Sequence, residues 1–386
     1  MRVGIDATGW TNRRGYGRFT RNAITRLVDG DPETTYVLYV DSETAAEALL
    51  PDRAEKRVVR LRRAPVQAAA AGSSRPVGDL LRLTAAVRGD RPQAFLFPAL
   101  QTYFPVVGTP TVVGLHDTIP EELPKLTLGD GRARTLWRAK QGLAIRLATR
   151  LFTVSESSRR AIASRLRVAP DRLAVVPEAP DPVFVRRSAE EISRARRAVG
   201  LDTDGRYLLY AGGISPHKDV ETLVRAFANV RDARLVLVGD LESETYLSAA
   251  ASVRKAISEL HLEDDVVLPG YVDDATLAAL YSGAAVVVIP SLGEGFGLPA
   301  VEAAACGAPL VLSDLPAHRE TMDGAALYFP PGDAEALTAR LNDALSSPGD
   351  LGERARRTVG GRTWDSAAER LRELLVAAAG TNGGAR

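Results

Sequence analysis

The chain has 386 residues, a length that suggests two or three domains, and its 45% hydrophobic and 25% charged residues are typical of a soluble globular protein. A formal net charge of +1 gives no electrostatic basis for binding nucleic acid, so no nucleic-acid partner is expected. The N-terminus lacks the pattern of a signal peptide, no apolar run reaches about 18 residues, and there is a single cysteine. We therefore expect a cytoplasmic protein without a membrane span or an internal disulfide.

Short apolar runs alternate with helix-like segments from one end of the chain to the other. Runs of four to eight apolar residues between helical stretches predict buried parallel strands. The expected strands are 2–7, 35–40, 56–61, 94–98, 111–116, 150–155, 173–177, 206–213, 234–240, 265–272, 284–290 and 308–314. This alternation predicts an α/β fold with doubly wound sheets.

A shift in composition at 179–205 marks a candidate domain boundary, because two prolines, a charged helix-like segment and a polar turn follow one another there. We expect one Rossmann-like domain at 1–183 and a second at 184–365. Residues 366–386 should form an amphipathic helix, packed back on the first domain, and a disordered tail.

Residues 131–150 form a predicted helix with six basic side chains and no acidic one. Leu136, Leu143 and Leu147 can line one face of this helix. One interpretation is peripheral contact with the inner face of a membrane, and the other is a solvated basic face. We favour the solvated face.

A glycine turn follows the expected strand at 206–213 and leads into a helix-like segment. Lys218 stands just before that helix, where its ammonium group can pair with a diphosphate at the carboxyl edge of the sheet. Taken alone, a lysine before a helix is more often a solvated residue. The interpretation therefore depends on a second motif at the same edge.

The second motif is SLGEGFGLPAVEAAACG at 291–307, which also joins a strand to a helix. Gly295 and Gly297 let the backbone approach a ligand closely, and the free N–H groups of a helix start favour phosphate or hydroxyl oxygens. Glu294 and Glu302 can accept hydrogen bonds from such a ligand, although acidic residues near a helix start also occur for structural reasons. One acidic and one basic turn in the same domain favour a nucleotide sugar.

Glu294 and Glu302 are spaced as in the E-x7-E motif of the retaining family-4 glycosyltransferases, and the chain resembles that family. Residues 4–27, 114–124 and 154–184 are similar to the family's N-terminal loop and helix, its H-D segment and its linker. The resemblance covers nearly the whole chain and implies the GT-B fold, in which two Rossmann-like domains face each other across a cleft. The H-D-x-I-P and P-H-K sequences are most similar to bacterial mannosyltransferases of polysaccharide assembly.

The resemblance implies that the second domain binds the nucleotide sugar. Glu294 would hold hydroxyls of the donor sugar, Glu302 the ribose hydroxyls and Lys218 the diphosphate. The residues implied to contact the donor through their backbone are Gly295, Phe296, Gly297 and Leu298 for the sugar, and Tyr271 and Val272 for the base. Gly212 departs from the pattern, because many relatives have there an arginine that shares the diphosphate charge; His217 or an arginine of the first domain is a candidate replacement.

The first domain would bind the acceptor. The resemblance places His116 beside the transferred sugar as a third catalytic residue, with Asp117 orienting it or capping the turn. It also places Gly15 or Gly17 near the phosphates or the acceptor. Two aromatic side chains beside that glycine turn can stack on an acceptor sugar, those of Trp10 and Tyr16.

The predicted reaction is the transfer of a hexose, with mannose from GDP-mannose favoured, to a glycan, lipid-linked or small-molecule acceptor with retention at the anomeric carbon. We expect no cofactor and no metal ion, because the isolated D-x-D of Asp202 and Asp204 precedes a strand and is typical of a polar turn. A UDP-glucose-type glucosyltransferase and a phosphorylase-like enzyme are alternatives with the same fold. A two-domain solute-binding protein is the alternative from another class.

Overall fold

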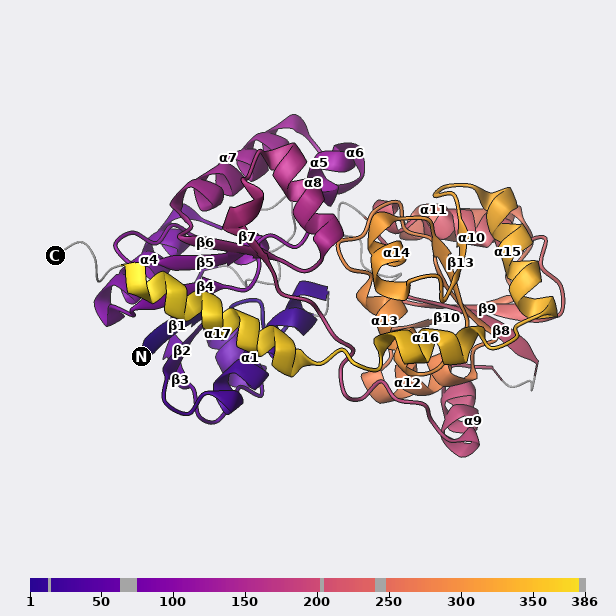
Figure 1. The fold of residues 1–386 in the computed structure, drawn as a ribbon. Coiled ribbons are helices and arrows are strands. Elements are labelled where there is room, and N and C mark those ends of the chain that lie inside the picture. The colour runs from indigo at the N-terminus through magenta and orange to yellow at the C-terminus, as the bar shows by residue number, and fades with distance from the viewer. Residues whose placement is uncertain (13–14, 63–74, 202–204, 240–247, 382–386) are drawn as a thin grey trace. The chain divides into compact units, whose positions relative to one another are not determined.

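The part of the chain that the computed structural model describes (Figure 1) consists of residues 1–12, 15–62, 75–201, 205–239 and 248–381. Internal contacts divide the chain into two compact units, here called unit 1 and unit 2. Unit 1 comprises Met1–Glu178 and Thr363–Arg386, and unit 2 comprises Ala179–Arg362. Each unit has its own parallel sheet with connecting helices, so the predicted α/β class with two Rossmann-like sheets is confirmed.

Unit 1 is built on a seven-stranded parallel sheet in the order β3-β2-β1-β4-β5-β6-β7. The central strands are apolar and almost fully buried, as expected of parallel strands covered on both faces. The strands are β1 Arg2–Asp6, β2 Thr35–Val40, β3 Glu55–Val58, β4 Ala94–Phe97, β5 Thr111–Gly114, β6 Arg150–Thr153 and β7 Leu173–Val175. The helical segments are α1 Gly15–Gly30, α2 Ser42–Glu47, α4 Val77–Asp90, η1 Leu100–Thr102, α5 Ile119–Glu122, α6 Pro124–Thr127, α7 Gly131–Leu147, α8 Glu156–Leu166, η2 Pro170–Arg172 and α17 Trp364–Gly380.

Unit 2 is built on a six-stranded parallel sheet in the order β10-β9-β8-β11-β12-β13. Its strands are β8 Arg206–Ala211, β9 Ala233–Val238, β10 Val266–Gly270, β11 Val286–Ile289, β12 Leu310–Ser313 and β13 Leu327–Phe329. The helical segments are α9 Ala189–Ala198, η3 Pro216–Lys218, α10 Val220–Phe227, α11 Ala250–Glu259, α12 Asp274–Gly283, α13 Leu298–Ala305, α14 Pro316–Met322, α15 Ala334–Ser346 and α16 Leu351–Val359. The strand β13 was absent from the sequence-based prediction.

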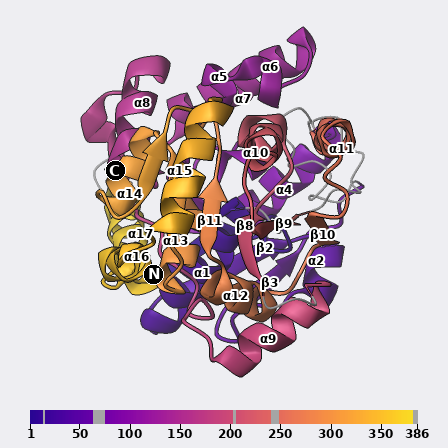
Figure 2. The ribbon, with the colours of Figure 1, turned by 90° about the vertical axis from the view of Figure 1, so that its right-hand side faces the viewer.

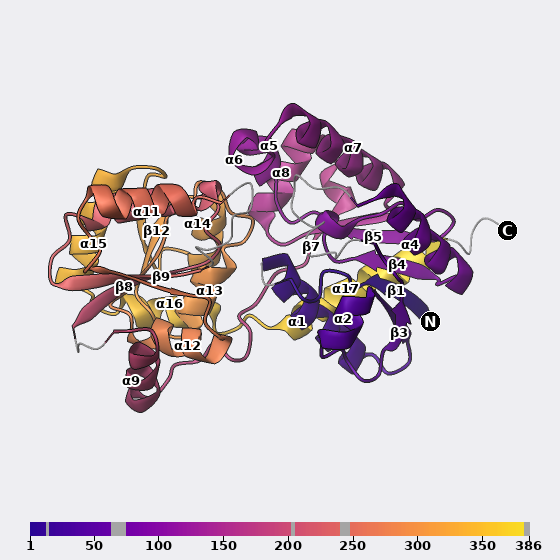
Figure 3. The same cartoon turned by 180° about the vertical axis from the view of Figure 1, so that it is seen from behind.

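The last helix, α17, belongs to unit 1 although it follows unit 2 in the sequence. It packs along α1, as Figures 1 and 3 show, and the rings of Phe19 and Trp364 meet edge to face with their centroids 5.9 Å apart. The chain therefore passes between the units twice, after Glu178 and after Arg362. The expected boundaries, after residues 183 and 365, lie a few residues further along the chain.

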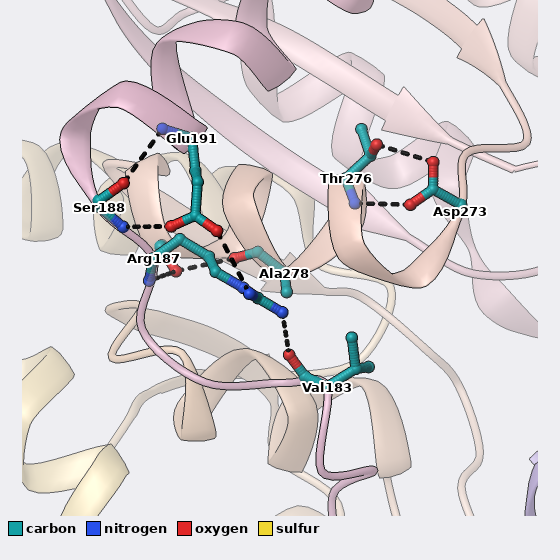
Figure 4. A network of polar contacts seen from close by, with 8 residues as sticks. Val183, Arg187, Ser188, Glu191, Asp273, Thr276 and Ala278 are labelled. Carbon is teal, nitrogen blue, oxygen red and sulfur yellow. Dashed lines mark hydrogen bonds and ion pairs between the residues drawn. The ribbon is translucent and has the colours of Figure 1, made fainter.

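The start of unit 2 is fixed by the polar contacts drawn in Figure 4. Ser188 and Glu191 form a capping box at the N-terminus of α9, which satisfies N–H groups that the helix leaves unpaired. The Arg187 guanidinium pairs with Glu191 at 3.3 Å and donates to the Val183 carbonyl at 2.7 Å. The Arg187 N–H donates to Ser282 Oγ on α12 at 3.0 Å, so the first helix of unit 2 is tied to the body of its own unit.

Candidate active site

Each sheet reverses its strand order at one point, between β1 and β4 in unit 1 and between β8 and β11 in unit 2. Ligands of open parallel sheets bind at such switch points, outside the carboxyl ends of the strands. Figure 2 shows β8 and β11 in the middle of the unit 2 sheet. The loops that follow these two strands carry the two motifs predicted to bind a nucleotide sugar.

Lys218 and Glu294 form an ion pair at the unit 2 switch point, with Nζ 2.7 Å from Oε1. Ser291 Oγ donates to the same carboxylate oxygen, also at 2.7 Å. The backbone N–H of Leu292 donates to the His217 carbonyl at 2.8 Å. Main-chain and side-chain bonds thus join the two loops, and the two residues predicted as separate ligand contacts lie in direct contact.

The electrostatic surroundings of Glu294 favour its ionised form. Burial alone would raise the pKa of this carboxyl, but the charge of Lys218 and the hydrogen bonds from Lys218 and Ser291 bring it below the usual value. The Glu294 side chain is only 8% exposed and that of Lys218 is 20% exposed, so solvent screens the pair weakly. A carboxylate held in this way is suited to accept hydrogen bonds from ligand hydroxyls.

Gly297 ends the loop with a left-handed backbone conformation, φ 84°, which favours glycine. A Cβ atom at this position would lie 2.9 Å from Cδ2 of His318, so the loop fits directly against the imidazole. His318 is fully buried, and its Nδ1 lies 2.8 Å from the Ser313 carbonyl at the end of β12. Sequence reasoning missed His318, because no spacing in the sequence marks it as a neighbour of the loop.

The start of α13 has few backbone donors. Pro299 has no N–H, and the N–H groups of Ala300 and Val301 both donate to the Gly297 carbonyl. Among the first residues of this helix, the amide of Leu298 is therefore the one placed to meet a ligand. This geometry is consistent with the predicted backbone contact at Leu298.

The remaining predicted donor contacts lie around the same sheet edge. Glu302 is on α13 and is 4% exposed, while Phe296 is buried at the end of the loop. Tyr271 and Val272 follow β10, which β9 separates from β8, and the Tyr271 side chain is 56% exposed. Their roles in donor binding stay predictions.

Gly212, where an arginine was expected from the resemblance, has no room for a side chain without a shift of Tyr210. A Cβ atom there would lie 2.9 Å from the Tyr210 hydroxyl oxygen, and this hydroxyl donates to the Gly213 carbonyl at 2.7 Å. Packing thus gives a reason for glycine at this position. Lys218 is left as the cation that the β8 loop holds against Glu294.

In unit 1, His116 follows the carboxyl end of β5, and its Nε2–H donates to the Pro98 carbonyl at 2.8 Å. Its ring packs edge to face against Phe19, with 4.9 Å between the centroids. Burial lowers the pKa of His116 to about 4, so the ring is neutral at physiological pH. Asp117 accepts from the N–H of Ile119 at 2.9 Å, which makes it a cap of the turn before α5.

The depressed pKa of His116 predicts a pH dependence of stability. The unfolded chain binds a proton on this histidine near pH 6.5 and the folded protein only near pH 4, so the free energy of unfolding should fall as the pH drops through this window. The slope from this group is at most about 1.4 kcal/mol per pH unit. Urea unfolding at pH 7, 6 and 5 should show a shallower decline in His116→Asn than in the wild type; parallel declines would contradict the assignment.

The glycines and aromatic residues near the start of α1 differ in their surroundings. Gly17 is packed against the carbonyl of Asn12, so any side chain there would collide with the backbone, whereas Gly15 faces open space. Trp10 is a core residue with 3% exposure, and Tyr16 is partly exposed. Burial thus favours Tyr16 over Trp10 as an acceptor contact, and the acceptor roles stay predictions.

Acidic residues form no metal-type group in the part of the chain that the structure describes. Asp202 and Asp204 lie outside the described residues. Asp273 is the N-cap of α12 and accepts from the N–H and hydroxyl of Thr276, both at 2.8 Å (Figure 4). Within the described ranges, no three His, Cys, Asp or Glu side chains are grouped as metal ligands.

The predicted basic helix is α7, and its leucines are exposed. The exposed fractions of Leu136, Leu143 and Leu147 are 46%, 40% and 39%. Trp137 and Ala144 cover the buried side of the helix. Among the helices that the structure describes, none is long and apolar enough to cross a bilayer.

Comparisons with known proteins agree with this geometry. Residues 14–183 match the model of the Glycosyltransferase Family 4 domain, and residues 191–363 match that of the Glycosyl transferases group 1 domain. The first match lies on unit 1 except for residues 179–183, and the second lies on unit 2 except for residue 363.

Curated relatives are similar over part of their length. An MMP alpha-(1->4)-mannosyltransferase of Mycolicibacterium hassiacum is 37% identical over 226 residues, which are 56% of this chain and 51% of the relative. A D-inositol 3-phosphate glycosyltransferase of Kineococcus radiotolerans is 32% identical over 253 residues, 60% of this chain and 57% of the relative. The chain thus spans about half the length of the curated relatives it matches.

Solved structures share the fold over almost the full chain. Sucrose-phosphate synthase from Thermosynechococcus elongatus superposes with a TM-score of 0.77 at 20% identity, covering 97% of both chains. Anabaena HepE in complex with UDP and glucose gives the same TM-score and identity, covering 97% of this chain and 99% of that one. The solved structures show that the chain has the GT-B fold. The two domain models, which together match most of the chain, show that it belongs to the glycosyltransferases that combine a Family 4 domain with a group 1 domain.

Proposed function

We propose that the protein transfers a hexose from a nucleoside diphosphate sugar to a glycan, lipid-linked or small-molecule acceptor, with retention at the anomeric carbon. The observation that carries this proposal is the Lys218–Glu294 pair at the switch point of the group 1 domain, which combines a phosphate-binding cation with a hydroxyl-binding carboxylate. Unit 2 binds the donor and unit 1 the acceptor in this scheme. The domain matches set aside the alternative of a solute-binding protein.

Mannose from GDP-mannose is the donor we favour. Mannosyltransferases are among the relatives that match the chain, at 37% identity in M. hassiacum and 27% identity in the Escherichia coli protein WbdA. UDP-glucose is the second candidate, because the structural neighbour HepE was crystallised with UDP-glucose. Glucose and mannose differ at one hydroxyl, so the choice between them depends on contacts of the kind that Glu294 makes.

In the proposed reaction, the bond between the anomeric carbon and the diphosphate oxygen breaks, and the acceptor oxygen bonds to the same face of that carbon. The departing phosphate oxygen takes the acceptor's proton. Lys218 and the start of α13 stabilise the negative charge that develops on the phosphate, an effect that typically contributes a few kcal/mol per preorganised donor. His116 of unit 1 serves in this scheme as a neutral hydrogen-bonding group for a sugar hydroxyl. No metal ion or cofactor takes part in this scheme.

A thermal-shift screen against GDP, UDP, ADP and their sugar conjugates, with EDTA present throughout, tests the donor site. A ligand at 100 times its dissociation constant adds about 2.7 kcal/mol to the stability of the folded state. We expect one nucleotide family to stabilise the wild type and to stabilise Glu302→Ala much less, because Glu302 binds the ribose hydroxyls.

Glu335→Ala is the matched control, since Glu335 is an exposed glutamate on α15 of the same unit. It should respond to nucleotides as the wild type does. Stabilisation of Glu302→Ala equal to that of the control would remove Glu302 from the site. No stabilisation of the wild type by any nucleotide would refute the donor site as a whole.

A further inference from the structure

The unit 1 sheet has a switch point of its own, between β1 and β4, which takes no part in the proposed donor site. Asp6 is the last residue of β1, Thr8 follows it, and Gln101 lies after β4. By the same topological rule that places the donor on unit 2, a ligand of unit 1 is expected here. The polar side chains around this point then indicate its chemistry.

A chain of hydrogen bonds links Asp6, Thr8 and Arg75. The Thr8 hydroxyl donates to Asp6 Oδ1 at 2.6 Å, and Arg75 Nη2 donates to Thr8 Oγ1 at 2.5 Å. Asp6 and Thr8 are both buried, with exposures of 1% and 0%. Asp6 Oδ2 and Arg75 Nη1 are buried atoms without a hydrogen-bond partner in the described part of the chain. A buried donor and a buried acceptor left unpaired cost roughly 1–3 kcal/mol each, unless a ligand satisfies them.

Lys140 adds a second cation from α7. Its Nζ donates to the carbonyl of Gln101 at 3.2 Å and lies over the Trp137 ring, 4.9 Å from the centroid. Burial and, to a smaller extent, the charge of Arg75 lower the pKa of Lys140 to about 8. Within the described ranges, no carboxylate forms an ion pair with Arg75 or Lys140. Two cations thus share one region, and Thr8 links the Asp6 carboxylate to one of them, Arg75.

We propose that Arg75 and Lys140 bind a phosphate group of the acceptor, while Asp6 Oδ2 accepts a hydrogen bond from one of its hydroxyls. The ligand class is therefore a phosphorylated sugar or polyol, either free or as the head of a lipid. A planar guanidinium and an ammonium are the usual partners of phosphate oxygens, and a buried carboxylate oxygen is suited to a hydroxyl. Naming this ligand the acceptor depends on the proposed function, but the anion site itself does not.

Calorimetric titration with glucose 6-phosphate and with inorganic phosphate tests the site. The full-length protein is first saturated with the nucleotide that stabilises it, so that phosphate cannot report on unit 2. We expect binding to the wild type that is at least tenfold weaker in Arg75→Gln and in Lys140→Gln, and much weaker binding of glucose than of glucose 6-phosphate. Arg146→Gln, a change of an exposed arginine on the same helix α7, should bind as the wild type does.

Equal phosphate affinity in the wild type and both variants would overturn the proposal. It would also be overturned if the wild type bound neither a phosphate ester in solution nor a phosphorylated polyprenol in vesicles. Nucleotide stabilisation that persists in Arg75→Gln and Lys140→Gln shows that these variants fold and separates this site from the donor site. Failure of the anion site alone leaves the proposed function intact.

Cosedimentation with vesicles containing a phosphorylated polyprenol distinguishes the two sources of the phosphate group. Binding that needs the vesicle indicates a lipid head group, and binding of glucose 6-phosphate in solution indicates a free phosphate ester.

Discussion

Replacing Lys218 with alanine is expected to lower the turnover number by roughly two to three orders of magnitude. The Lys218 ammonium is the cation that the β8 loop presents at the switch point, and Gly212 offers no second charge from the same turn. Charge that develops on the departing diphosphate would then rest on backbone amides alone. The measurement is steady-state transfer of sugar from the preferred nucleotide sugar, with kcat and KM determined separately.

The Lys218 variant also leaves Glu294 buried without its partner, so stability must be measured beside activity. We expect a loss of about 1–3 kcal/mol in the free energy of unfolding. Lys255→Ala is the matched control, because Lys255 is 74% exposed on α11 of the same unit and pairs only at 3.5 Å with Glu259. Turnover within threefold of the wild type in folded Lys218→Ala would eliminate the assigned role.

Replacing Glu294 with glutamine is expected to lower kcat/KM by roughly one to two orders of magnitude while nucleotide binding is retained. Glutamine keeps the shape of the side chain but removes the charge that pairs with Lys218, and its amide group offers one acceptor oxygen instead of two. In the proposed site, the sugar hydroxyls would then have a weaker acceptor at position 294, whereas the nucleotide would keep its contact with Glu302. Transfer assays and nucleotide titrations on the same preparation measure the two effects.

Two comparisons make the Glu294 result specific. Glu335→Gln, on an exposed face of α15, should leave both quantities unchanged. A free nucleotide without a sugar should bind Glu294→Gln and the wild type with similar affinity. If the affinity for the free nucleotide falls as much as kcat/KM, Glu294 supports the whole pocket and the sugar-specific role is wrong.

The sequence predicted the sheets well because buried parallel strands are continuous apolar runs. The expected strands at 35–40 and 94–98, for example, correspond to β2 and β4. The strand β13 was not predicted, because the three residues Leu327–Phe329 are too few to show a hydrophobic pattern. Its pairing with β12 defines it as a strand. Only the neighbouring strand, which lies outside any local window, supplies that information.

Some residues of the candidate site could likewise be predicted from the sequence, and others could not. Lys218 and Glu294 could be predicted because each stands in a glycine turn at a strand end, and the fold joins these turns. His318 could not be predicted, because it lies on α14 and only the fold brings its ring against Gly297. The grouping of Arg75 and Lys140 also could not be predicted from the sequence. These residues are far apart along the chain, and only the folded unit 1 brings their charges close together.

The return of α17 to unit 1 has a consequence for synthesis. The ribosome makes α1 early, but the helix that packs on it emerges only after all of unit 2. At 5–20 residues per second, translation of the roughly 330 residues between α1 and α17 takes about 17 to 67 seconds. During this interval Phe19 and its neighbours on α1 lack their contacts with Trp364 and the rest of α17. The nascent protein thus exposes an apolar surface on α1 while unit 2 folds. Chaperones that recognise such surfaces can bind it until Trp364 has been synthesised and packs on α1.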